Sequence, residues 1–155
     1  MVYLDARLSR AYPTVELRVA DVCADVADAV LVAGLCRGLV EVAAREWAEG
    51  VPAADVRLEV LRGAAWRAAR SGMSGELVDT LTARTAPARV MVERLVDHVE
   101  PALRAYGDLD TVWAGARRVL DEGTGADRQR AAHARSGGDL VYVVADAVER
   151  TTADR

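Results

Sequence analysis

The chain has 155 residues and a net charge of −4, and 52% of its residues are hydrophobic while 28% are charged. This composition excludes a disordered or fibrous chain, and the length predicts a single domain over residues 1–155. The acidic balance argues against a protein that holds nucleic acid through a basic surface. The longest apolar run is too short to cross a membrane, and Cys23 and Cys36 are not spaced as metal ligands. We therefore expect a cytoplasmic protein with reduced thiols and no membrane partner.

Two stretches near the start of the chain alternate apolar and polar side chains with a period of two, as β-strands do. In residues 2–8 the polar face carries Asp5 and Arg7, and in residues 14–19 it carries Glu16 and Arg18. The connector between them is short, which predicts an antiparallel hairpin. The four charged side chains would then share one surface, which suits a metal ion and a phosphate. Cross-strand ion pairs on a solvated face are the structural alternative.

A ribbon of two strands over residues 1–21 is only marginally stable in water by itself. Its apolar face therefore needs a cover. Either the later helices of this chain pack on it, or the missing strands come from another chain.

The rest of the chain, residues 22–155, has the apolar periodicity of helices. Asp25 is placed to cap a first helix that runs to about Trp47, and a second helix is expected from about Ala54 to Ser71. Gly75 to Pro87 breaks this pattern with turn residues and an extended piece at 76–79. Three further helices follow, at about 88–106 with Pro101 inside it, at about 109–122 with Asp108 as its cap, and at 139–151. With a helix opened by the turn at 123–125, the sequence predicts an α+β fold, a β-ribbon followed by five or six helices.

The stretch from Gly123 to Arg130 combines a Gly-x-Gly turn with two arginines. Such a turn at the start of a helix can present backbone N–H groups to an anion, and Arg128 and Arg130 could add phosphate or carboxylate contacts. The full glycine pattern of a nucleotide-binding loop is missing, so a simple turn between two helices is the favoured interpretation of these residues alone.

Four stretches taken in order resemble the C-terminal half of the bacterial carboxylate–amine ligases of the glutamate–cysteine ligase type. They are Asp5 to Arg7, Tyr12 to Asp21, Ala65 to Gly72, and Gly123 to Arg130. The resemblance covers nearly the whole chain. It implies a glutamine-synthetase-like fold, in which an antiparallel sheet faces the active site and helices back it.

The resemblance also implies the chemistry. These ligases use ATP and Mg²⁺ to convert a carboxylate into an acyl phosphate, which an amine attacks to form an amide. By resemblance, Glu16 is the magnesium ligand, Arg18 contacts the transferred phosphate, and Arg7 orients a substrate carboxylate. Asp5, Arg128 and Arg130 complete the set of candidate substrate- and phosphate-binding residues.

The length of the chain departs from this family, whose members are more than twice as long. Their N-terminal half supplies most of the sheet and further metal-binding glutamates. We therefore expect the chain to be inactive alone and to act as part of a split ligase, with a protein partner that supplies the missing half. The alternative is a non-catalytic binding or regulatory module that pairs with a full-length relative. A third possibility is a fragment that forms a homo-oligomer to cover its edge strand.

Overall fold

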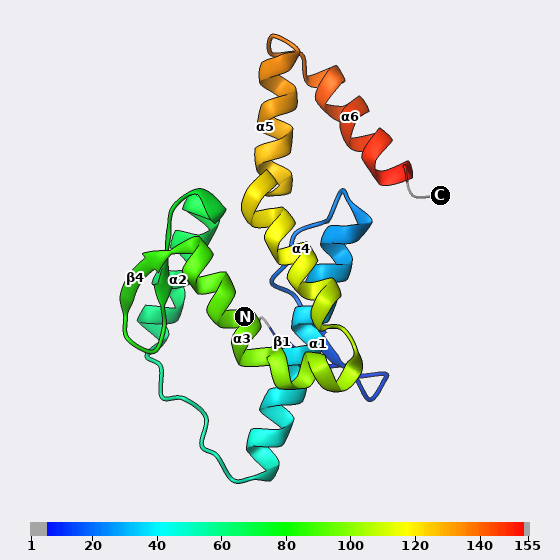
Figure 1. Ribbon diagram of the computed structural model, residues 1–155. Coiled ribbons are helices and arrows are strands. Elements are labelled where there is room, and N and C mark those ends of the chain that lie inside the picture. Colours follow the sequence, from blue (N-terminus) through cyan, green and yellow to red (C-terminus); the bar gives the residue numbers. More distant parts are fainter. Residues whose placement is uncertain (1–5, 154–155) are drawn as a thin grey trace.

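The computed structural model describes residues 6–153 (Figure 1). The elements follow in the order β1 (Ala6–Leu8), β2 (Val15–Leu17), α1 (Val26–Ala48), α2 (Leu58–Ser71), a 3₁₀ turn η1 (Gly72–Ser74), β3 (Glu76–Asp79), β4 (Arg84–Pro87), α3 (Ala88–Tyr106), α4 (Leu109–Glu122), α5 (Gly125–Arg135) and α6 (Leu140–Thr152). The strands form two separate antiparallel pairs, β1–β2 and β3–β4. The predicted α+β fold is confirmed.

The core lies where α1, α3 and α4 pack against one another. Its most deeply buried side chains are Val96, Val99, Leu103 and Val112. Two glycines of α1, Gly34 and Gly38, lie four residues apart and therefore on one face of the helix. A Cβ atom on Gly38 would lie 2.9 Å from the Cβ atom of Val99. The absence of a side chain at this position is what lets α1 approach α3 so closely.

Most helix bounds agree with the sequence prediction, and the differences have local causes. Asp25 caps α1 as expected, because its carboxylate accepts the N–H of Ala27 at 2.8 Å. Helix α2 begins at Leu58 rather than at about residue 54, since Arg57 is extended and the N–H of Val56 turns back to the carbonyl of Ala54. Asp108 precedes α4 as expected, but its carboxylate makes no cap. It pairs instead with Arg37 of α1.

The C-terminal part of the chain projects from this core (Figure 1). Helices α5 and α6 form a hairpin that extends beyond α4, and Asp139 caps α6 by accepting the N–H of Val141 at 2.8 Å. The side-chain hydroxyl of Thr151 donates to the carbonyl of Ala24 at 3.2 Å. The end of α6 therefore lies against the segment that precedes α1.

The N-terminal ribbon is shorter than predicted, with three residues in each strand. Its register pairs Arg7 with Glu16 on one face, and Leu8 with Val15 on the other. Leu8 is 78% exposed, and Val15 and Leu17 are also exposed. The helices of this chain thus leave the apolar face of the ribbon largely uncovered. For the described residues, the prediction that the later helices pack on the ribbon is therefore wrong.

The accessible surface of the chain is unusually large for its mass. It amounts to 11,168 Å², whereas a compact monomer of 16.6 kDa exposes about 7,600 Å². The excess of about 3,600 Å² comes with many exposed large apolar side chains, on the ribbon, on α2 and on α6. None of the helices within residues 6–153 is long and apolar enough to span a bilayer.

The close approach of α1 and α3 gives a first prediction. Gly38→Ala forces a methyl group against Val99, and we expect it to lower the free energy of unfolding by about 1–3 kcal/mol. Gly63→Ala is the matched control, because Gly63 lies within α2 and a Cβ atom there meets open space. That variant should gain about 0.5–1 kcal/mol from helix propensity. Urea unfolding of both variants checks the contrast, and a stabilised Gly38→Ala variant would contradict the packing described here.

Candidate functional site

The polar face of the ribbon brings Arg7 and Glu16 together. The guanidinium Nε of Arg7 donates to Glu16 Oε2 at 2.6 Å, and the side chains are 51% and 38% exposed. This bond is the main reason why the pKa of Glu16 is lowered, and the charge of Arg18 acts in the same direction. Arg18 follows Glu16 by two residues, just after the end of β2. Asp5, the fourth predicted residue of this face, lies outside the described residues.

The second predicted segment forms the junction of α4 and α5. Gly123 has a φ of +87°, a left-handed conformation that ends α4 and that glycine adopts without strain. Thr124 then starts α5 with a capping box, in which its backbone N–H donates to Asp127 Oδ2 at 2.8 Å. The bonds from Thr124 lower the pKa of Asp127, the backbone N–H most strongly. The Gly-x-Gly turn therefore connects and caps two helices.

The two arginines of this junction point in different directions. Arg130 is 70% exposed and pairs with Asp127, one turn back on the same helix, at 2.5 Å. Arg128 is only 12% exposed, donates to the carbonyl of Gly123 at 3.2 Å, and pairs with Asp28 of α1. Both guanidinium groups are thus held by carboxylates of the chain itself.

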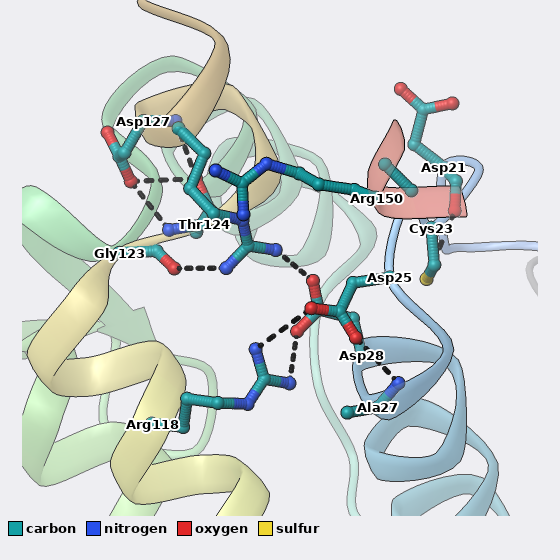
Figure 2. Close-up of polar contacts among 12 residues, drawn as sticks. Asp21, Cys23, Asp25, Ala27, Asp28, Arg118, Gly123, Thr124, Asp127 and Arg150 are labelled. Atoms are coloured by element: carbon teal, nitrogen blue, oxygen red, sulfur yellow. Dashed lines mark hydrogen bonds and ion pairs between the residues drawn. The ribbon is translucent and has the colours of Figure 1, made fainter. Parts of the chain in front are cut away.

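Asp28, the partner of Arg128, belongs to a larger group of charges, of which Figure 2 shows Asp25, Asp28 and Arg118. Asp28 also accepts from Arg118 of α4, whose Nη2 lies 2.6 Å from Asp28 Oδ1. The same guanidinium reaches Asp25, the cap residue of α1, at 3.7 Å. We call these four residues, Asp25, Asp28, Arg118 and Arg128, the Asp28 cluster. All four side chains are less than one third exposed, and the cluster joins the start of α1 to α4 and α5.

Sequence reasoning did not find the Asp28 cluster. The available signal was Asp28 itself, a single charge among apolar and small residues between Val26 and Cys36. Its partner Arg128 lies 100 residues further along the chain, and no local pattern connects the two.

A hollow of about 450 Å³ lies next to this cluster. It is lined by residues of both segments that the sequence singles out, the stretch that ends at Asp21 and the stretch that begins at Gly123. One wall is the connector after β2, with Asp21 and Cys23, and the other is the start of α5, with Thr124 and Gln129. Leu31 and Val119 contribute apolar surface. Residues of the Tyr12–Asp21 stretch and of the Gly123–Arg130 stretch thus line one space, although about 100 residues separate them in sequence.

The described part of the chain does not gather the ligands of a metal centre by itself. Within residues 6–153, no three side chains of histidine, cysteine, aspartate or glutamate lie together in an arrangement that could hold a metal ion. Glu16 is a hard oxygen donor of the kind that Mg²⁺ prefers, and it would be one ligand among several.

Comparison with known proteins gives one consistent result. The model of the glutamate–cysteine ligase family 2 matches residues 1–149. A Frankia alni protein that is provisionally named glutamate–cysteine ligase 2-2 is 56% identical over 146 residues, which are 93% of this chain and 38% of the relative. A Streptomyces coelicolor protein with the provisional name glutamate–cysteine ligase 2 is 51% identical over 99% of this chain and 42% of its own length. The chain therefore spans about two fifths of the length of these relatives.

The Asp28 cluster predicts unequal roles for the two arginines of α5. Arg128→Met leaves a half-buried carboxylate without one of its two cations, and we expect a loss of about 1–3 kcal/mol in the free energy of unfolding. Arg130→Met, two residues away on the same helix, breaks an exposed pair and should cost less than about 0.5 kcal/mol. Denaturant unfolding of both variants measures the difference. Equal losses would show that Arg128 does not hold α5 to α1.

The lowered pKa of Asp127 predicts a pH dependence. Because the folded pKa lies below the ordinary value of 3.8, the carboxylate stabilises the fold fully above about pH 4. That contribution is lost as the pH falls toward the folded pKa. Asp127→Asn should therefore lose less stability than the parent chain between pH 4 and pH 2. Urea unfolding at several pH values in this range measures it, and parallel curves for the two proteins would contradict the assignment.

Proposed function

The chain belongs to the glutamate–cysteine ligase family 2, and from this premise we propose that it is one part of an ATP- and Mg²⁺-dependent carboxylate–amine ligase. In the proposed reaction the substrate carboxylate attacks the γ-phosphorus of ATP and releases ADP. The amine then attacks the acyl phosphate, forms the amide and releases inorganic phosphate. The observation that carries the proposal is the polar face of the ribbon, on which Arg7 and Glu16 are paired and exposed and Arg18 follows.

Each of these residues has a role that follows from its charge. Phosphoryl transfer depends mainly on positioning and on neutralising phosphate charge, for which Mg²⁺ supplies a cation when it is bound. Glu16 would hold that ion through its carboxylate, which is ionised at neutral pH and whose pKa the bond from Arg7 lowers further. Arg18 would contact the transferred phosphate, and Arg7 would orient the substrate carboxylate through its planar guanidinium. Arg130, exposed on α5, is a further candidate for an anionic group.

We propose that the chain needs a second polypeptide segment for this activity. Two observations support this proposal. The apolar face of the ribbon is exposed, and the total surface exceeds that of a compact monomer by about 3,600 Å². Each partner contributes about 800 Å² to an interface of standard size and about 1,000–2,500 Å² to an obligate one, so this excess is large enough for an obligate assembly. The segment would correspond to the part of the relatives that this chain does not span.

Substrates and location are part of the same proposal. Glutamate and cysteine are the carboxylate and amine that the names of the relatives suggest. The cytoplasm is the compartment in which ATP is available and in which the free thiols of Cys23 and Cys36 remain reduced.

The second candidate function is a non-catalytic module that pairs with a full-length relative through the ribbon edge. The Arg7–Glu16 bond favours this candidate, because a satisfied ion pair requires no ligand to explain it. Strand addition to β1 or β2 would provide the affinity.

Glu16→Gln separates the two candidates. We would mix the chain with the unspanned segment of the Frankia alni relative and measure ADP release and amide formation with ATP, Mg²⁺, glutamate and cysteine. We expect activity only in the mixture, and roughly a 100-fold or greater loss of kcat in the Glu16→Gln mixture, by analogy with the removal of one charge-stabilising contact. Glu59→Gln on α2 is the matched control and should keep full activity.

Two results would each overturn one part of this proposal. Full activity of the Glu16→Gln mixture would remove Glu16 as metal ligand. A stable complex with no ADP release for any carboxylate–amine pair tested would favour the non-catalytic module.

A further inference from the structure

A second hollow lies far from the ribbon in sequence, between α2, β3 and α3 and beside the connector from α1 to α2. Its volume is about 820 Å³. Ala64, Ala65 and Ala68 of α2 form one wall, and Leu77 of β3 with Met91 and Leu95 of α3 form the other. We call it the α2–α3 groove. Three alanines on one wall leave the helix backbone open to close approach.

Helix α2 gains little burial from the rest of the described chain. It is amphipathic, yet none of its residues is buried, and Leu58 and Leu61 are exposed. A helix of 14 residues is marginal in water and normally gains its stability by packing its apolar face. Its polar attachment is Arg67, whose Nε donates to the carbonyl of Glu76 at 2.8 Å.

Two charged side chains at the groove, Asp79 and Arg94, pair with each other. Asp79 pairs with Arg94 at 3.2 Å and also accepts the N–H of Leu81 at 3.0 Å, which closes the turn after β3. Leu81, at the tip of this turn, is 75% exposed and lines the groove. Apolar side chains that are surrounded by paired polar groups are typical of the core of a protein interface.

We propose that the α2–α3 groove is a docking surface for the same segment that the proposed function requires, the part of the relatives that this chain does not span. This inference rests on the proposed function. About three fifths of the length of the relatives lies outside the matched stretch, so a large partner is available. The six strand residues of the ribbon are too few to account for an excess surface of about 3,600 Å².

A second copy of this chain fits the groove less well. Two copies related by a two-fold axis bring the same surface patch together. A concave patch placed against itself leaves the hollow unfilled, whereas a helix or strand of a different segment can enter it.

Ala68→Arg tests the proposal, with Ala69→Arg as its matched control. Both residues are exposed on α2, but only Ala68 lines the groove. Because both positions are exposed, neither introduced arginine side chain would clash with the core. Both variants should therefore show the circular dichroism spectrum and the unfolding midpoint of the parent chain. Leu81→Asp, on the exposed turn, is a second variant at the groove that leaves α2 unchanged.

Binding to the unspanned segment of the Frankia alni relative is measured by titration calorimetry and sedimentation. We expect Ala68→Arg and Leu81→Asp to weaken the association roughly 30-fold or more, as loss of a central interface contact does. Ala69→Arg should change it less than about threefold.

The other outcomes separate this inference from the ligase proposal. Equal affinities for Ala68→Arg and Ala69→Arg would overturn the docking surface, while amide formation by the parent mixture would leave the ligase intact. Weakened binding by Ala68→Arg with no ADP release from the parent mixture would support the docking surface and count against the ligase. No association of the parent chain, or self-association that Ala68→Arg abolishes, would overturn the proposed occupant.

Discussion

Asp28 accepts the guanidinium groups of Arg118 and Arg128, and this interaction links the parts of the molecule that carry the candidate site. Asp28 lies in the first turn of α1, just after the connector that follows the ribbon. Arg118 lies on α4 and Arg128 on α5. Charge therefore joins α5 to the start of α1 and adds to the hydrophobic contacts that already pack α1 against α4. Asp28 also lines the hollow beside the cluster.

This dependence on polar contacts follows from how little of the chain is buried. The core of α1, α3 and α4 contains few large side chains, whereas apolar residues of the ribbon, of α2 and of α6 remain exposed. Such side chains cost little individually, but together they mark surface that a partner can cover. The structure is therefore organised as a small packed centre with three extensions, each of which shows an apolar face. This organisation is the reason why we propose that the chain gains further stability by burying apolar surface in an assembly.

The sequence predicts best those features that depend on residues close together in the chain. The start of α1 follows from the cap at Asp25, and the bounds of α3 follow from apolar periodicity. The pairing of Arg7 with Glu16 follows from the alternation in the two strands. The cap expected of Asp108 failed, since Arg37 of another helix competes for the same carboxylate. The Asp28–Arg128 contact could not be predicted, because no spacing rule relates residues 100 positions apart.

The Arg7–Glu16 pair is compatible with both candidate functions for a physical reason. Both side chains are well exposed, and an exposed ion pair contributes little net stability, so a ligand can displace either partner at small cost. The pair keeps Glu16 ionised and oriented on the ribbon face, which is also the state in which a carboxylate binds a cation. A buried pair would have resisted such an exchange, as the Asp28 cluster does. The difference in exposure between these two groups of charges is what separates a surface that can exchange its partners from one that holds the fold.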